Sequence, residues 1–432
     1  MIDIRLLRSD PESTIAALSK RGIDRAELEA IIELDKKQRE LNIQADQARA
    51  KIKQLSGEVA KLKREGRDEE AQALQSQSRE LGEVASQLIA QADKAASATR
   101  QALLVTPNIP APECPVGKDE KDNVLVRSWT PSDFDAWRDF QRVPHWEIGS
   151  ELNILDLESG AKLSGSMFPL FRGAGAKLIR ALTSFALDAH SDAFEEIRPP
   201  TFVRSETMRS TGHLPKFSDE AYHMERDDLW AIPTAEVPLT SIARDSILKE
   251  SELPIRMTAV TACFRREAGA AGRDTRGLLR VHEFDKVEIL SYATSDQANS
   301  IHMELLDRAE KLVQALGLTY RILDLCTGDL GASSRRTFDI EVYAPGCDQW
   351  LEVSSVSWFG DYQARRANIR YRKTNGNSIE FVNTLNGSAL AWPRIWAAII
   401  ESGRQKDGSI LLPKCLSPYL GGKLTISSDG LF

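Results

Sequence analysis

A seven-residue repeat of apolar side chains runs through the first hundred residues of this chain. Its first half places apolar residues at Leu34, Leu41, Ala48, Leu55 and Leu62, with Ala45, Ile52 and Val59 between them. After a glycine-containing turn it resumes at Leu74, Leu81, Leu88, Ala95 and Ala102, with Ala71, Ser78, Ala85 and Ala92 between them. This spacing on both sides of a turn predicts an antiparallel two-helix coiled coil over about residues 28–103. Each helix of roughly 35 residues would extend on the order of 50 Å.

The two predicted helices carry opposite charge. Between Leu34 and Arg64, nine Lys and Arg stand beside four Asp and Glu, whereas between Glu65 and Leu103 the numbers are four and seven. Because the whole chain has a formal net charge of −7, a nucleic acid would have to bind a local basic surface. The first helix offers such a surface, which could follow a phosphate backbone. A solvated coiled-coil surface or a dimerisation rod is the alternative.

The segment 106–112, TPNIPAP, separates this arm from the rest of the chain, because its prolines cannot continue a helix. We therefore expect two domains, 1–106 and 107–432, in a chain whose 42% hydrophobic content is that of a globular protein. The five cysteines lie far apart without a CxxC pair, which argues against a disulfide framework and a zinc cluster. Since there is no apolar signal core and no run of about 18 apolar residues, we expect a cytoplasmic protein without a membrane partner.

The stretch Cys263–Glu288 predicts two strands around a loop of small residues. Arg265 and Arg266 precede the loop, and guanidinium groups beside a glycine-rich turn can pair with phosphate oxygens. Carboxylates at Glu267 and Glu288 lie close by, so a ligand here would carry both signs of charge. A salt-bridged surface hairpin is the alternative. The second strand is expected to alternate through four apolar residues: Leu279, Val281, Phe284 and Val287.

Two further segments carry candidate binding residues. Thr234 and Glu236 would share a face of an extended segment and could hold an ammonium group, unless Thr234 caps a helix that begins near Glu236. Arg394 lies in the first turn of an apolar helix expected over 395–402. There it would face either an anion or a buried salt bridge.

The segment 351–357, LEVSSVS, reads as a strand. Alternation would put Glu352 and Ser354 on one face, and Val353 and Ser355 on the other. A carboxylate with a nearby hydroxyl could hold Mg²⁺ at a nucleotide phosphate. Ordinary sheet serines are the alternative.

Together these segments resemble a bacterial-type seryl-tRNA synthetase, a class II aminoacyl-tRNA synthetase, over essentially the full length. The resemblance rests on the opening MIDIRLLRSDPE, the arm, and three class II signatures at 198–200, 264–288 and 384–394. It implies an α+β fold, in which the coiled-coil arm is followed by a catalytic domain with a mostly antiparallel, six-stranded sheet flanked by helices. It also implies a homodimer built on the first signature. The arm would bind tRNA(Ser), and tRNA(Sec) where one exists.

The implied activity is that of a serine–tRNA ligase, which activates L-serine with ATP and transfers it to the tRNA. The resemblance assigns ATP binding to Arg265, Arg266, Glu267, Val281, Phe284, Glu352, Val353, Ser354, Ser355 and Arg394. It assigns serine binding to Thr234, Ala235, Glu236, Arg265, Glu288, Thr384 and Ser388. Arg265 and Arg394 are the implied catalytic residues, and Glu352 and Ser355 the implied Mg²⁺ ligands. The loop Ala268–Arg276 is expected to contact the tRNA acceptor end.

The chain departs from the family's usual residues at Val356, Trp358, Trp392 and Glu283, and Trp396 adds a third tryptophan nearby. These tryptophans either repack the core behind the site or narrow the pocket, as a duplicated, inhibitor-resistant synthetase would need. A serine-activating paralogue that loads a carrier protein is a further alternative, although it would have no use for the arm. An inactive tRNA-binding paralogue is the last, although it would not need the intact site residues.

Overall fold

The computed structural model describes residues 1–269, 272, 274–376 and 378–432. These residues form two compact units, Ile2–Thr106 and Pro107–Phe432, with Met1 belonging to the second. Within the described ranges, no helix combines the length and the hydropathy that a membrane span requires.

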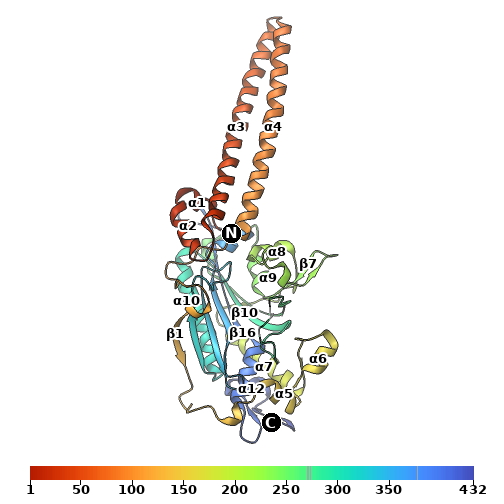
Figure 1. The fold of residues 1–432 in the computed structure, drawn as a ribbon, viewed down its shortest axis with the longest axis vertical. Helices are drawn as coiled ribbons and strands as arrows, with labels where there is room; N and C mark the ends of the chain where they lie inside the picture. The colour runs from red at the N-terminus through yellow and green to blue at the C-terminus, as the bar shows by residue number, and fades with distance from the viewer. Residues whose placement is uncertain (270–271, 273, 377) are drawn as a thin grey trace. The chain divides into compact units, whose positions relative to one another are not determined.

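The first unit is built around two long antiparallel helices, α3 (Arg25–Arg64) and α4 (Asp68–Val105), which we call the arm (Figure 1). The short helices α1 (Ile4–Ser9) and α2 (Pro11–Ser19) precede it. The predicted coiled coil is confirmed. Leu41 and Leu55 of α3 are buried, and α4 contributes mainly small residues to the seam: Ala71, Ala85, Ala92 and Ala95. Alanine at these positions leaves room for the larger side chains of the facing helix.

An eight-stranded sheet forms the centre of the second unit. Its order is β1 (Val124–Trp129), β11 (Tyr320–Asp324), β12 (Arg336–Ala344), β13 (Gln349–Trp358), β16 (Asn383–Ala391), β10 (Glu283–Ala293), β9 (Ile255–Phe264) and β4 (Glu195–Glu196). Neighbouring strands are antiparallel except for β4 and β9. The expected fold class is confirmed. The sheet has eight strands rather than six, because β1 and the two-residue β4 extend its edges.

Shorter elements surround this sheet. The helices are α5 (His145–Glu151), α6 (Leu157–Ser164), α8 (Ser205–Thr211), α9 (Glu236–Ser241) and α11 (Tyr362–Ala367). Four small sheets join β2 (Leu155–Asp156) to β3 (Leu170–Phe171), β5 (Phe202–Arg204) to β7 (Leu229–Ala231) and β6 (His223–Met224), β15 (Ile379–Phe381) to β14 (Arg370–Arg372) and β8 (Ile247–Lys249), and β17 (Ile410–Leu411) to β18 (Thr425–Ser427) and β19 (Gly430–Leu431).

Three longer helices bury the main core against the sheet: α7 (Gly173–Asp188), α10 (Ser295–Ala315) and α12 (Trp392–Gly403) (Figure 1). Val287 and Ile289 of β10 belong to this core. Successive side chains of a strand point to opposite faces, so Leu290 and Tyr292 pack instead in a second cluster with α9 and α11. The second face of β10 also carries the polar residues of the candidate site.

Strand β10 begins later than the sequence pattern suggests. The pattern predicts a start near Leu279, whereas the strand begins at Glu283. Just before it, the N–H of His282 donates to the carbonyl of Met167, outside the ladder between β9 and β10. The segment 279–282 is therefore irregular backbone, and its first three residues line a pocket.

Strand β13 contains a bulge that changes which side chains share a face. Glu341 pairs with Glu352 but Ile340 pairs with Ser354, so Val353 is an extra residue. The prediction that Glu352 and Ser354 share a face is therefore wrong. Ser354 donates its hydroxyl to the carbonyl of Ser388 at 2.6 Å, and Ser355 shares a pocket with Glu352 instead.

Candidate active site

Two cavities of about 270 and 260 Å³ adjoin each other on the sheet. The first, which we call the arginine pocket, is lined chiefly by Arg265, Glu267, Leu279, Arg280, Val281, Phe284, Lys286, Glu352, Val353, Ser388 and Arg394. The second, the carboxylate pocket, is lined chiefly by Thr234, Glu236, Arg265, Lys286, Glu288, Glu352, Ser355, Asn386 and Ser388. Four residues line both: Arg265, Lys286, Glu352 and Ser388. The two cavities therefore form one continuous site.

Two arginines from different elements define the arginine pocket. Arg394, in the first turn of α12, donates to the carbonyls of Glu352 (2.8 Å) and Leu279 (3.2 Å). Its ion pair with the Glu352 carboxylate is long, at 3.8 Å, and the two side chains are 30% and 49% exposed, so it is no buried salt bridge. Arg265, just after β9, lies 5.1 Å from the ring centroid of Phe284. Guanidinium groups beside an apolar wall suit a nucleotide, whose phosphates and base need different surroundings.

Glu236 is buried at the start of α9, in the carboxylate pocket. Its two oxygens accept hydrogen bonds from Gln363 (2.6 Å) and Asn386 (2.9 Å). Thr384 in turn donates to the side-chain oxygen of Gln363 at 2.6 Å, so it supports this carboxylate without lining either pocket. Burial raises the pKa of Glu236, and the hydrogen bond from Gln363 opposes that shift.

Glu288 lies deeper, with its side chain 1% exposed. It accepts a hydrogen bond from Thr234 at 3.0 Å and forms an ion pair with Lys286. Thr234 also accepts from the backbone N–H of Glu236 at 3.3 Å, although the N-cap residue of α9 is Ala235. Burial raises the pKa of Glu288, whereas the positive charge of Lys286 lowers it. Two buried carboxylates in one pocket would attract an ammonium group.

Lys286 is the main site residue that the sequence analysis missed. It lies on β10 between Phe284 and Glu288, and a spacing of two residues in a strand puts the three side chains on one face. This spacing could have identified Lys286 from the sequence. Arg280, which pairs with Glu267, and Asn386 were also not singled out.

Four expected site residues line neither pocket: Ala235, Arg266, Ser354 and Thr384. Ala235 is fully buried in the second core cluster. Arg266 is exposed, and its backbone N–H donates to the carbonyl of Glu220. Within the loop expected to contact tRNA, three residues lie outside the described part of the chain: Ala270, Ala271 and Arg273.

Three oxygen-bearing side chains could hold a divalent cation beside the pockets. Glu352 and Ser355 both line the carboxylate pocket, and Asp339 of β12 pairs across the ladder with Ser355. Among the described residues, the buried Oδ1 of Asp339 has no hydrogen-bond partner. Burial and the nearby carboxylate of Glu352 raise the pKa of Asp339 well above its ordinary value. An unsatisfied carboxylate oxygen beside a second carboxylate and a hydroxyl fits the oxygen ligands that Mg²⁺ takes.

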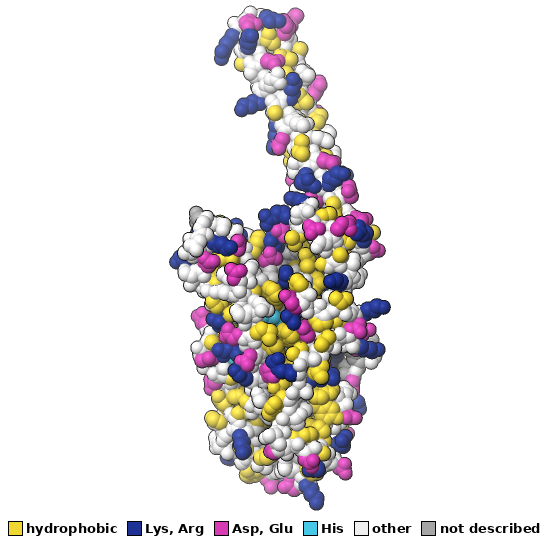
Figure 2. Space-filling model, turned by 90° about the vertical axis from the view of Figure 1, so that its left-hand side faces the viewer, with side chains coloured by type: hydrophobic (Ala, Val, Ile, Leu, Met, Phe, Trp, Pro, Cys, Tyr) yellow, Lys and Arg dark blue, Asp and Glu magenta, His cyan; other side chains and the backbone are white. Residues whose placement is uncertain are grey.

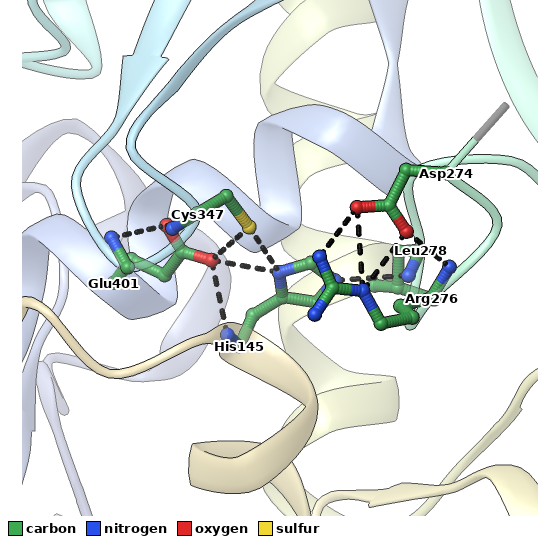
Figure 3. A network of polar contacts seen from close by, with 7 residues as sticks. His145, Asp274, Arg276, Leu278, Cys347 and Glu401 are labelled. Carbon is green, nitrogen blue, oxygen red and sulfur yellow. Dashed lines mark hydrogen bonds and ion pairs between the residues drawn. The ribbon is translucent and has the colours of Figure 1, made fainter.

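A buried network of hydrogen bonds holds the backbone at Leu278, which lines the arginine pocket (Figure 3). The Nε2 atom of His145 accepts from the N–H of Leu278 at 2.9 Å, so Nδ1 carries the hydrogen and donates to Glu401 at 2.8 Å. Cys347 also donates to Glu401, at 3.1 Å. Gly277 has φ +58°, and a Cβ there would lie 2.4 Å from His145 Nε2. Hydrogen bonds thus occupy both ring nitrogens and fix the backbone that enters the pocket.

The three tryptophans lie outside both pockets. Trp392 and Trp396 both pack edge-on against Phe171. The centroid of the Phe171 ring lies 4.9 Å from that of Trp392 and 5.3 Å from that of Trp396. Trp358 donates its N–H to Asn383 at 2.9 Å. Their positions favour repacking of the core over narrowing of the site. Glu283 is exposed at the start of β10 and also lines neither pocket.

Each of the two units contains a segment that matches a known family model. Residues 1–110 match the family model "Seryl-tRNA synthetase N-terminal domain". Residues 217–403 match the model "tRNA synthetase class II core domain (G, H, P, S and T)". Curated serine–tRNA ligases of Pelobacter propionicus and Fervidobacterium nodosum are 44% and 45% identical, over 98% of this chain and 99% and 98% of their own lengths.

Solved structures agree with these matches. The crystal structure of seryl-tRNA synthetase from Pyrococcus horikoshii, complexed with ATP, is 33% identical, with a TM-score of 0.92 over 99% of both chains. The cytoplasmic serine–tRNA ligase of Naegleria fowleri, in complex with AMP, is 26% identical, with a TM-score of 0.88 over 99% of both chains.

The antiparallel sheet, its two pockets and the matched core domain define a class II aminoacyl-tRNA synthetase. Within that class, the chain belongs to the family of serine–tRNA ligases, which are ATP-dependent ligases.

Proposed function

We propose that the arginine pocket binds ATP, that the carboxylate pocket binds L-serine, and that the resulting seryl-adenylate charges tRNA(Ser). The observation that carries this assignment is the continuity of the two pockets through Arg265, Lys286, Glu352 and Ser388. A serine carboxylate and an α-phosphate must meet at such a boundary. The nucleotides bound to the Pyrococcus horikoshii and Naegleria fowleri relatives support a nucleotide here.

ATP is assigned to the residues of the arginine pocket. Phe284 and Val281 offer an apolar wall for the adenine, beside Glu267. Arg394 holds the far phosphates and Arg265 the α-phosphate, because guanidinium groups pair with phosphate oxygens. Arg266 and Ser354 line neither pocket; the backbone N–H of Arg266 donates to Glu220, and the hydroxyl of Ser354 donates to the carbonyl of Ser388.

Serine is assigned to the residues of the carboxylate pocket. Its ammonium group binds between Glu236 and Glu288, its hydroxyl bonds to Glu288, and its carboxylate faces Arg265. A buried site that bonds a substrate hydroxyl rejects an analogue without it by roughly 10⁴–10⁵, so alanine is excluded. Threonine must be excluded by lack of room. Thr384 contributes through Gln363, and Ala235 through the start of α9.

The chemistry requires no covalent bond to the protein. A serine carboxylate oxygen attacks the α-phosphorus, the bond to the bridging oxygen of the β-phosphate breaks, and pyrophosphate leaves. The 3′-terminal hydroxyl of the tRNA then attacks the seryl carbonyl, and AMP leaves. Arg265 and Arg394 position the phosphates and stabilise the charge that develops on them.

Mg²⁺ is the metal that the donor set fits. Glu352 and Ser355 would hold it, and the carboxylate of Asp339, which pairs with Ser355 across the ladder, would help to neutralise its charge. When bound, the ion would draw electron density from the phosphate oxygens and orient the polyphosphate.

The partners follow from the arm and from the first signature. The arm is proposed to bind tRNA(Ser), and tRNA(Sec) where one exists, because most basic side chains of α3 are exposed (Figure 2). Figure 2 shows Lys and Arg beside Asp and Glu along the face of the arm that it draws. A homodimer is proposed through 198–200 and α7, and a cytoplasmic location is consistent with five free cysteines.

ATP–pyrophosphate exchange with each amino acid in turn tests the proposal. Serine should support exchange, while alanine and threonine should not, because alanine lacks the hydroxyl that bonds to Glu288 and threonine lacks room. Exchange with another amino acid, or none with serine, would refute the assignment of the carboxylate pocket.

A further inference from the structure

Lys286 lies at the boundary between the two pockets. Its side chain is only 7% exposed, and its Nζ pairs with Glu288 while donating to the hydroxyl of Ser388 at 3.3 Å. Of the four residues that line both pockets, Lys286 and Arg265 are the cations. A positive charge is thus held where serine and ATP would meet.

The ion pair occupies the group that serine needs. Lys286 and Thr234 both contact the same oxygen of Glu288, Oε2. A serine ammonium that binds Glu288 at this oxygen therefore competes with Lys286. A buried ammonium separated from its carboxylate is costly, so it needs another anion within reach. Ser388, to which Lys286 is already bonded, lines the arginine pocket as well, so the phosphate of a nucleotide bound there would offer such an anion.

We propose that Lys286 is a catalytic residue that moves between two anions: it pairs with Glu288 in the free enzyme and with the α-phosphate of ATP once the serine ammonium has replaced it. The idea rests on the proposed function, because it needs ATP and serine in the two pockets. Lys286 stabilises charge on the α-phosphate while the serine carboxylate attacks and pyrophosphate leaves. Serine binding thereby prepares the ATP site, and the two affinities become coupled.

The serine affinity of Lys286→Met distinguishes this role from a purely structural one. If Lys286 only stabilised the pocket, Lys286→Met would weaken serine binding, because Glu288 would lose its support. If it competes with serine, the same variant should bind serine without ATP as tightly as the wild type or more tightly, by calorimetry near pH 8. Its kcat for pyrophosphate exchange should nevertheless fall by about 10²–10³, the usual effect of losing one charge-stabilising donor. An unchanged kcat, or weakened serine binding whatever the kcat, would overturn the proposal.

Ligand analogues test the coupling in the unaltered enzyme. The α,β-methylene analogue of ATP should bind about 5–150-fold more tightly when serine is present. Serinamide, which has the ammonium but no carboxylate, should retain part of this effect, because the ammonium displaces Lys286. 3-Hydroxypropanoate, which lacks the ammonium, should have none. Coupling by 3-hydroxypropanoate but not by serinamide would overturn the proposal, and in Lys286→Met the coupling should disappear.

Two comparisons separate this proposal from the assignment on which it rests. Lys311→Met removes an exposed lysine of α10, 70% exposed, and should leave kcat and coupling unchanged. A wild-type enzyme that fails to exchange pyrophosphate with serine would refute the proposed function itself. A wild-type enzyme that exchanges while Lys286→Met matches it in rate and coupling would refute only the role of Lys286.

Discussion

At the scale of single residues, Glu288 makes the most demanding contact in the site. Its carboxylate is buried, bonded to Thr234 and paired with Lys286. Glu288→Ala should abolish serine-dependent pyrophosphate exchange, and Glu288→Gln should lower kcat/KM for serine by about 10²-fold, because the bond to the ammonium loses its charge. Steady-state exchange kinetics measure both effects. Near-normal exchange by Glu288→Ala would exclude it as a serine ligand.

The fall of kcat/KM for serine at acid pH should reflect the protonation of Glu288. Burial raises the pKa of Glu288, so its neutral form persists to a higher pH than for an ordinary carboxyl. A protonated Glu288 cannot attract an ammonium, and kcat/KM for serine should therefore fall on acidification before an unperturbed Glu would titrate. The profile of Glu288→Gln should lack this fall. An identical fall in that variant would assign the titration to another group.

The tryptophans carry a separate prediction about inhibitors. Trp358, Trp392 and Trp396 line neither pocket, so they leave the adenylate site its ordinary shape. A seryl-sulfamoyl adenosine analogue should therefore inhibit exchange tightly, as expected of a mimic of the bound intermediate. A weak effect, restored to strong inhibition by Trp392→Ala, would instead support a resistance role.

Residue types and order predicted much of this site, whereas the contacts of Lys286 could not be read from the chain. The resemblance brought together Arg265, Glu288, Glu352 and Arg394 from distant segments, and all four line the pockets. Lysine in a strand is ordinarily a solvent-facing residue. That this one is buried depends on the packing around β10, which single-residue patterns do not contain.

At the scale of elements, α10 is tied to β13 through a buried histidine. His302 donates from Nε2 to the carbonyl of Val356 at 3.0 Å, and burial lowers its pKa to about 4. Its pKa in the unfolded chain is about 6.5. Between these values the unfolded chain binds more protons, so the free energy of unfolding should fall as the pH drops from 6.5 toward 4, by about 3 kcal/mol at the lower end.

Urea unfolding at a series of pH values measures this effect. His302→Gln keeps an amide donor for Val356 but does not titrate, so its loss of stability on acidification should be smaller. If the free energies of unfolding of the two proteins fall in parallel between pH 7 and 4, His302 does not contribute to the loss of stability.

Sequence patterns predicted the helices of the arm but not the bulge in β13. The coiled coil was predictable because its seam repeats over many turns. In β13, strict alternation placed Glu352 with Ser354, whereas one bulged residue, Val353, brings Glu352 and Ser355 to the same pocket. A bulge depends on how the partner strand is paired, and a single strand's pattern does not contain that information.

At the scale of the whole molecule, the arm and the catalytic unit should serve different steps. Replacing residues 34–103 by a short Gly–Ser linker should spare serine-dependent pyrophosphate exchange and abolish tRNA charging, because the pockets lie wholly within the second unit. Parallel exchange and charging assays measure the two steps. Retained charging would contradict the role of the arm.

A milder variant keeps the arm and removes only charge. Lys51, Lys53, Lys61 and Lys63 of α3 are all exposed, and changing them to Gln should raise KM for tRNA with little effect on exchange. The salt dependence of tRNA binding should become shallower, by about 0.9 in log–log slope for each phosphate that these lysines no longer neutralise. An unchanged slope would place the tRNA-binding surface elsewhere.

The central claim is that one continuous site joins serine to ATP for delivery to tRNA. Charging of total tRNA by the purified protein, with each labelled amino acid in turn, tests it most directly. Serine alone should become attached, only in the presence of ATP, and the charged species should be tRNA(Ser) together with tRNA(Sec) where one exists. Attachment of another amino acid, or serine activation without any charged tRNA, would contradict the account.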